Sequence, residues 1–159
     1  MNPEKPIRVM LVDDHAVVRS GLSAFLLASD DLDLVGEASS GEQAIQTCQK
    51  LQPDVILMDL GMPGMGGAEA TGIIRKECPH TQVIILTSFK EKNLVESALK
   101  AGAIGYLLKD ATAEKLIDAI HSAAAGKPTL SSEAAQVLIQ ATRAPADRVG
   151  FNLTDRERE

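Results

Sequence analysis

The chain has 159 residues, enough for one domain and an appendage. Its 16 basic and 22 acidic residues give a net charge of −6, which argues against unaided nucleic-acid binding because that needs a basic surface. Tryptophan is absent and only 3% of the residues are aromatic, so we expect an aliphatic core.

The sequence also bears on the compartment. The two cysteines, Cys48 and Cys78, lack the spacing of a metal site and are predicted to be free thiols in a reducing cytosol. The first apolar run, Ile7–Val12, ends at Asp13 and Asp14, which no signal peptide would tolerate. No apolar run approaches the length of a membrane span. We therefore expect a cytoplasmic protein with no membrane partner.

Five short apolar runs have the composition of strands buried on both faces; in chain order they are Ile7–Val12, Leu32–Ala38, Val55–Met58, Val83–Leu86 and Ile104–Leu108. A stretch with helical periodicity follows each run. Strict alternation of strand and helix predicts a parallel sheet with helices on both faces, which is a three-layer α/β sandwich.

Local signals locate the first two helices. The first has an apolar face formed by Val17, Val18, Leu22, Phe25 and Leu26. In the second, Ser40 is expected to act as N-cap with Gln43 as its capping-box partner, and the helix should end near Leu51 because Pro53 follows.

The later helices have similar signals. The third is predicted from about Gly67 to Cys78. The fourth has Gly102 as a plausible C-cap, and the fifth begins after the N-cap Thr112. The apolar residues of the fourth helix are Leu94, Val95, Ala98 and Leu99, and those directed inward in the fifth are Leu116, Ile117 and Ile120.

The domain boundaries follow from this pattern. Residues 1–126 are expected to form one domain, and residues 127–143 to contain an extended start, with Lys127–Leu130, and an extra C-terminal helix. Residues 144–152 are predicted to be a linker, and residues 153–159 to begin a further unit.

Polar side chains follow four of the predicted strands. Asp13 and Asp14 follow the first, Asp59 the third, Thr87 the fourth and Lys109 the fifth. The second strand ends instead in Ser39–Ser40–Gly41, so we expect it at the periphery of the sheet. Because parallel strands present their carboxyl ends at one edge, these polar groups should form a ligand site there.

The predicted cluster needs a cation, or a proton on one of its carboxylates. Carboxylates within about 5 Å of one another repel by about 3 kcal/mol per pair at an effective dielectric of 20. Lys109 supplies one positive charge, and Mg²⁺ suits a few carboxylates and waters. A carboxylate beside such an ion can act as the nucleophile in phosphoryl transfer, with Thr87 and Lys109 contacting the phosphate oxygens.

Four segments carry a resemblance to a known family: Val12–His15, Met58–Gly67, Leu86–Ser88 and Gly102–Lys109. They resemble the receiver domain of bacterial two-component response regulators over about residues 7–126. The resemblance implies a (βα)5 flavodoxin-like fold with a central five-stranded parallel sheet in the order 2-1-3-4-5. It also implies that a sensor histidine kinase supplies the phosphoryl group to Asp59.

The resemblance also implies roles for individual residues. Asp14, Asp59 and the Gly61 backbone carbonyl would bind Mg²⁺, and Asp13 would act on a metal-bound water. Lys109 would contact the phosphate, and Thr87 and Tyr106 would be a switch pair. We expect phosphorylation to promote a homodimer. One candidate surface is the fifth helix, with Ile117, Ile120, Ala123 and Ala124, alone or together with the first helix.

Residues 153–159, Leu-Thr-Asp-Arg-Glu-Arg-Glu, are similar to the opening of the LuxR-type helix-turn-helix domain, with Thr154 and Glu157 as a capping box. With the receiver motifs they indicate the NarL/FixJ class of transcriptional regulators. Promoter DNA is then expected to be bound by a C-terminal domain that this sequence only begins, and not by residues 1–159.

Two other activities fit the same fold. A phosphatase of the haloacid-dehalogenase type also uses an Asp nucleophile after a strand, but it needs a second Asp where this chain has Gly61. A nucleotide or flavin binder would need a phosphate loop after the first strand, where Asp13, Asp14 and His15 would repel a phosphate unless a metal is present.

Overall fold

The computed structural model describes residues 5–87, 92–127 and 129–130. Its elements are, in chain order, β1 (Ile7–Val12), α1 (Ala16–Leu27), β2 (Leu32–Ala38), α2 (Gly41–Leu51), β3 (Val55–Asp59), α3 (Gly67–Glu77), β4 (Gln82–Thr87), α4 (Lys92–Ala101), β5 (Gly105–Leu108), α5 (Ala113–Ala124) and β6 (Thr129–Leu130). The predicted alternation of five strands and five helices is confirmed.

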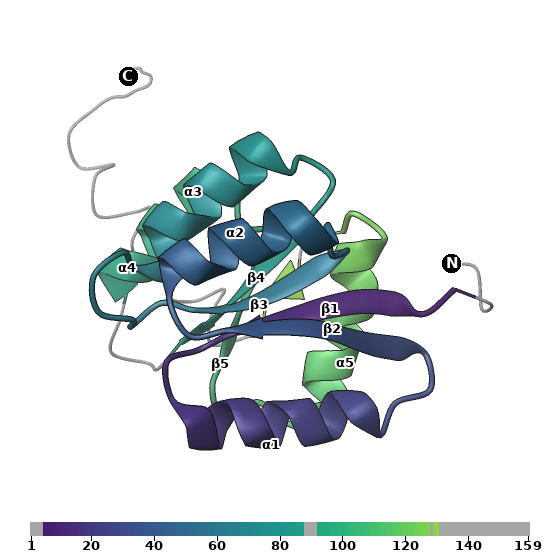
Figure 1. The fold of residues 1–159 in the computed structure, drawn as a ribbon. Coiled ribbons are helices and arrows are strands. Elements are labelled where there is room, and N and C mark those ends of the chain that lie inside the picture. Colours follow the sequence, from purple (N-terminus) through teal and green to yellow (C-terminus); the bar gives the residue numbers. More distant parts are fainter. Residues whose placement is uncertain (1–4, 88–91, 128, 131–159) are drawn as a thin grey trace, which may run out of the picture.

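The strands form one parallel sheet in the order β2-β1-β3-β4-β5-β6 (Figure 1). The predicted order of the first five strands is confirmed, and β2 lies at the edge as expected. The two-residue strand β6 extends the sheet beyond β5, with Gly105 opposite Thr129 and Tyr106 opposite Leu130. The sequence predicted an extended conformation there but not this pairing.

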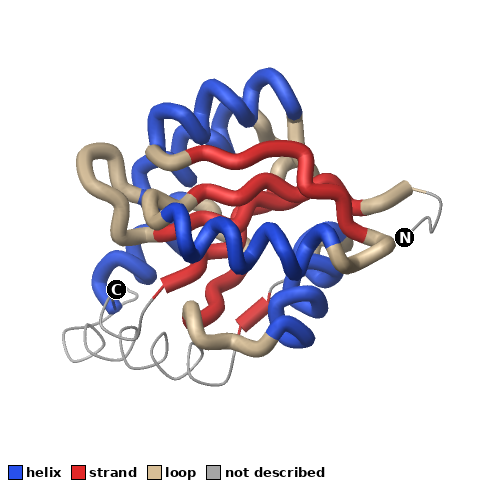
Figure 2. The backbone as a smooth tube through the Cα atoms, turned by 60° about the horizontal axis from the view of Figure 1, so that its bottom comes forward, coloured by secondary structure: helices blue, strands red, loops and turns tan. Residues whose placement is uncertain are grey.

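Helices cover both faces of the sheet, with α2, α3 and α4 on one side and α1 and α5 on the other (Figures 1 and 2). Two separate cores result, because alternate residues of each buried strand point to opposite faces. On β3, for example, Ile56 and Met58 lie in the core under α2–α4, whereas Val55 and Leu57 lie in the core under α1 and α5.

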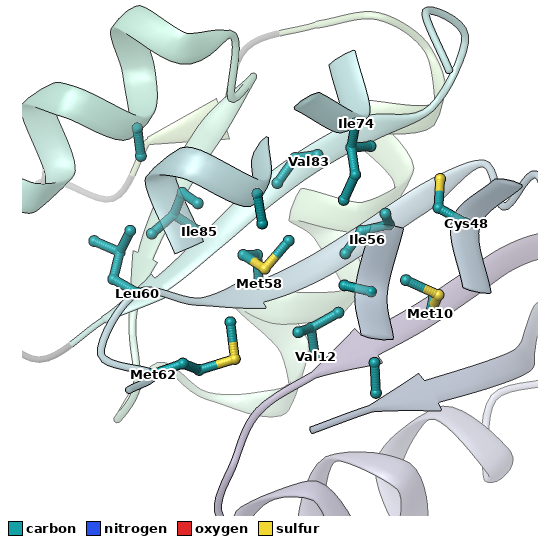
Figure 3. Packing of buried hydrophobic residues seen from close by; sticks show 14 of the residues in the cluster. Met10, Val12, Cys48, Ile56, Met58, Leu60, Met62, Ile74, Val83 and Ile85 are labelled. Atoms are coloured by element: carbon teal, nitrogen blue, oxygen red, sulfur yellow. The ribbon is translucent and has the colours of Figure 1, made fainter. Parts of the chain in front are cut away.

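The two cores differ in composition. Every buried methionine and cysteine among the described residues lies in the core under α2–α4, namely Met10, Cys48, Met58, Met62 and Cys78. The first four of these are labelled in Figure 3. Both cysteines are free thiols, as predicted. The core under α1 and α5 contains only aliphatic side chains, which agrees with the expectation from the low aromatic content.

The apolar face of α1 departs from the prediction. Leu26 is fully buried, but Val17 is 85% exposed and Phe25 is 45% exposed. Apolar residues occur around most of this helix, so their spacing fits more than one inward face, and the sheet covers only the one that includes Leu26. In α5 the prediction is confirmed, since Leu116 and Ile120 are buried and Ile117 packs against the same core.

The predicted N-caps hold α2 and α5 in place. The Ser40 hydroxyl accepts a hydrogen bond from the Gln43 backbone N–H at 3.1 Å, and Thr112 caps α5 in the same way. The return bond of the capping box is shifted by one residue, because the Gln43 side chain accepts from the backbone N–H of Ser39 at 2.7 Å. Gly102 follows α4 with a φ of +118°, a conformation that suits glycine.

The remaining predictions about the chain's C-terminal part concern residues 131–159, which lie outside the described residues. They include the extra helix, the linker and the segment similar to a helix-turn-helix opening. Of the helices that the structure describes, none is long and apolar enough to cross a membrane.

Candidate functional site

The polar residues predicted at the strand ends lie at one edge of the sheet. Asp13 follows β1, Asp59 ends β3, Thr87 ends β4 and Lys109 follows β5. Their strands run in close register there: Val12 pairs with Met58, Asp59 with Leu86, and Thr87 with Leu108. The sheet therefore brings together side chains that are almost a hundred positions apart in sequence.

An acidic cluster forms at this edge. Asp13, Asp14, His15 and Asp59 each offer a possible ligand atom, and these atoms all lie within 4.8 Å of one another. Asp13 and Asp59 are only 2% and 1% exposed. His15 was not predicted to belong to the cluster; the one signal for it was its position directly after the acidic pair.

The cluster contains one close ion pair to a lysine. The Nζ atom of Lys109 lies 2.8 Å from Asp59 Oδ1, and the backbone N–H of Gly61 donates to the same oxygen at 3.2 Å. Burial raises the pKa of Asp59, the Lys109 hydrogen bond opposes that rise, and the charge of Asp13 adds to it. Lys109 therefore offsets only part of the rise in the pKa of Asp59 that burial and the neighbouring carboxylate cause.

Two of the carboxylates present a buried oxygen that has no partner among the described residues, namely Asp13 Oδ2 and Asp59 Oδ2. Asp14 Oδ1 also accepts no hydrogen bond there, but the Nδ1 atom of His15 lies 3.1 Å from it. Asp13 Oδ1, by contrast, accepts from the His15 backbone N–H at 2.8 Å. Buried polar atoms in proteins are nearly always paired, so unpaired oxygens gathered in one place indicate a ligand. Several carboxylate oxygens that close together are the donor set that a hard divalent cation prefers.

The loop after Asp59 is held close to the site by glycine. A Cβ atom on Gly67 would lie 2.4 Å from the backbone oxygen of Asp59, so only glycine lets α3 begin this near to β3. Leu60 and Met62 anchor the loop in the core, with 3% and 6% exposure. Gly61 lies between these two anchors, which keeps its backbone beside the acidic cluster.

The two residues predicted to form a switch pair lie on neighbouring strands. Thr87 and Tyr106 are both buried, and Tyr106 pairs with Ile85, two residues before Thr87. Alternation along β4 directs Thr87 and Ile85 to the same face, the one covered by α2–α4, where Tyr106 also packs. The backbone N–H of Lys109 donates to the Thr87 carbonyl at 2.8 Å. Ser88 lies outside the described residues.

Known proteins resemble the chain along most of its length. The family model of the response regulator receiver domain matches residues 9–121. The transcriptional regulatory protein LiaR of Bacillus subtilis strain 168 is 44% identical over 155 residues, covering 96% of this chain and 74% of LiaR. The nitrate/nitrite response regulator protein NarL of Escherichia coli K12 is 40% identical over 162 residues, covering 100% of this chain and 75% of NarL.

A solved structure agrees with these relatives. A two-component response regulator of the LuxR family from Aurantimonas sp. SI85-9A1 is 33% identical to the chain and superimposes with a TM-score of 0.80. The match covers 87% of this chain and 99% of that one. Sequence and fold thus point to the same family.

Proposed function

The chain belongs to the family of response regulator receiver domains, in its NarL-like class, and we propose that its Asp59 accepts a phosphoryl group. A receiver of this kind is a phosphoacceptor switch rather than an enzyme. The observation that carries the proposal is the position of Asp59, whose buried carboxylate lies between the Lys109 ammonium and two further carboxylates at the carboxyl edge of the sheet.

The two oxygens of Asp59 have different surroundings. Oδ1 accepts from Lys109 and Gly61, whereas Oδ2 has no hydrogen-bond partner among the described residues. We assign Oδ2 as the atom that attacks phosphorus, while the bond from phosphorus to the donor's leaving group breaks. Lys109, and the hydroxyl of Thr87 at the end of the next strand, would contact the phosphoryl oxygens.

The acidic cluster fits Mg²⁺, because each of its carboxylates offers an oxygen atom within 4.8 Å of the others. Asp13, Asp14, Asp59 and the backbone carbonyl of Gly61 would hold the ion, with Asp13 acting on a water bound to it. When bound, Mg²⁺ neutralises charge on the carboxylates and on the phosphoryl oxygens.

Intact-mass measurement after incubation with a small acyl phosphate and Mg²⁺ tests the acceptor. The wild type should gain one phosphate, and Asp59→Asn, which is nearly isosteric, should gain none while staying folded. Asp14→Ala should be labelled more slowly. Asp33→Asn is a matched control, because Asp33 is an exposed carboxylate on β2 outside the cluster.

The same experiment separates the alternatives. Asp59→Asn labelled at the wild-type rate would show that the acceptor is wrongly assigned. Rapid turnover of many phosphomonoesters would indicate a phosphatase instead, and flavin retained through purification would indicate a binder.

We further propose that phosphate on Asp59 draws in Thr87, that Tyr106 then fills the space it leaves, and that a homodimer follows. Part of the surface first expected for the dimer needs correction, although Ala124 of α5 is exposed. Ile120 and Ala123 of α5 are fully buried against the sheet and cannot contact a partner. The exposed apolar residues of α1, which are Val17, Phe25 and Leu27, are the better candidates. Light scattering with and without a phosphoryl mimic tests the dimer.

The proposal assigns the chain's input and output by its family. A histidine kinase in the cytoplasm would be the phosphoryl donor, and residues 1–126 would be the receiver. Residues 127–143 would add a helix and residues 144–152 a linker to a LuxR-type DNA-binding domain that begins at residues 153–159. Because the 159 residues are acidic overall, they should bind promoter DNA negligibly without that domain. Fluorescence anisotropy of this chain and a longer version would decide.

A further inference from the structure

A side chain outside the acidic cluster contacts the loop that carries its first two carboxylates. The Nη1 atom of Arg19, in the first turn of α1, donates to the backbone carbonyl oxygen of Asp13 at 2.6 Å. Its Nε atom lies 3.3 Å from Glu37 Oε1 on β2, in an ion pair. The Arg19 side chain is 22% exposed, and through these two contacts it links the β1–α1 loop to the edge strand.

The backbone of Asp13 is therefore held from two sides. Its N–H donates to the Ala38 carbonyl at 3.1 Å, and its carbonyl accepts from Arg19. That carbonyl belongs to the planar peptide that joins Asp13 to Asp14. Fixing the carbonyl fixes the rotation of this peptide, and with it the directions in which both carboxylates leave the main chain.

This restraint acts against a known force. The carboxylates of Asp13, Asp14 and Asp59 repel one another, and this repulsion would be relieved if the peptide between Asp13 and Asp14 rotated and moved them apart. A pocket of about 150 Å³ lies next to Arg19, lined by Arg19, Glu37, Ala38, Ser39 and Gln43. The side chains of Ser39 and Gln43 in this lining hydrogen-bond to each other at 3.0 Å, and Arg19 is the residue that donates to the Asp13 carbonyl.

We propose that Arg19 is a positioning residue for the cation site: its guanidinium holds the Asp13 carbonyl so that the two carboxylates of the β1–α1 loop stay aimed at the carboxylate of Asp59. The inference rests on the proposed function, since it concerns the affinity of that site for Mg²⁺. Groups that orient metal ligands typically change metal affinity by 10–100-fold when they are removed.

The test compares two arginines that make the same kind of bond. Arg19→Met removes the bond to Asp13, and Arg8→Met removes a bond of 2.9 Å from Arg8 Nη1 to the Gln52 carbonyl, at the opposite end of β1. Isothermal titration of the full chain with MgCl₂ gives the dissociation constant, and urea unfolding gives the stability of each variant. Arg19→Gln is a second variant in case Arg19→Met does not fold.

Arg19→Met should raise the Mg²⁺ dissociation constant about tenfold, and Arg8→Met less than about twofold. The phosphorylation rate of Arg19→Met should recover to within about threefold of the wild type at saturating Mg²⁺, because the loss lies in affinity. Equal Mg²⁺ affinities of the wild type and Arg19→Met would overturn the role proposed for Arg19 but leave the proposed function intact. A phosphorylation-rate defect that persists at saturating Mg²⁺ would do the same. A wild type that neither binds Mg²⁺ nor gains phosphate would overturn the proposed function and this inference together.

Discussion

Asp59→Asn should make the protein more stable in the absence of a divalent cation. At 4.8 Å, the upper limit on their separation, and an effective dielectric of 20, the carboxylates of Asp13 and Asp14 each repel that of Asp59 by at least about 3.5 kcal/mol. The Lys109 ammonium, at 2.8 Å, attracts it by about 6 kcal/mol. The charge terms thus leave a net repulsion of at least about 1 kcal/mol, and the cost of burying the charge has the same sign.

We expect a gain of about 1–2 kcal/mol, or roughly 3–10 °C in Tm, from the neutral amide. The gain should depend on pH. Burial raises the pKa of Asp59 above its ordinary value of 3.8, so the protonated acid is favoured in the folded protein, and wild-type stability falls as pH rises through the raised pKa. The advantage of the variant should therefore be smallest near pH 4 and should grow as pH rises through the raised pKa of Asp59.

Mg²⁺ should reverse the order of the two proteins. Free Mg²⁺ at a hundred times its dissociation constant adds about 2.7 kcal/mol to the wild type. Asp59→Asn should gain less, because it lacks one of the three carboxylates. Thermal unfolding with EDTA and with MgCl₂ measures both effects, and the surface control Asp33→Asn should stay within about 0.5 kcal/mol of the wild type. A variant less stable than the wild type in EDTA, or equally stabilised by Mg²⁺, would refute the reasoning.

Three further substitutions test other parts of the structure. Gly67→Ala should cost about 1–3 kcal/mol in urea unfolding, because its Cβ would lie 2.4 Å from the Asp59 backbone oxygen, whereas Gly72→Ala on the same helix, with its nearest contact at 3.6 Å, should be neutral or stabilising. Burial raises the pKa of the Cys48 thiol from 9.0 to about 12, so the free energy of unfolding should fall as pH rises from 9 to 12. Cys48→Ala should show a smaller fall over this range, and parallel profiles of unfolding free energy against pH would contradict the prediction. Val17→Glu should weaken the phosphorylation-dependent dimer in light scattering, because Val17 is 85% exposed, and an unchanged dimer would exclude this part of α1 from the interface.

The alternation of strands and helices and the position of the site were predictable because each rests on a strong local signal, whereas the strand order was implied by the resemblance to the receiver family. Buried parallel strands are continuous runs of Val, Ile and Leu, and the polar residue that ends each run must lie at the carboxyl edge of the sheet. Asp59 and Lys109 could therefore be placed together although fifty positions separate them. Their ion pair needs only the register of the sheet.

Other features had no such signal. The exposure of Val17 depends on which side of α1 the sheet covers, and the helix is apolar enough to allow several choices. The bond from Arg19 to the Asp13 carbonyl involves a main-chain oxygen, which every residue possesses, so no pattern of side chains in the sequence predicts it. The pairing of β6 with β5 adds only two residues to the sheet and depends on the path of the chain after α5.

The uneven distribution of sulfur gives the protein a set of built-in reporters. Met10, Met58 and Met62 are buried under α2–α4, and Met65 packs against the same core. Methionine side chains are flexible and fill irregular space, so this core is the more deformable of the two. In NMR spectra of the protein with methyl-labelled methionine, the chemical shifts of these four ε-methyl groups would report repacking beneath α3 and α4 without any substitution. The core against α1 and α5, which contains no methionine, would give no signal in these spectra.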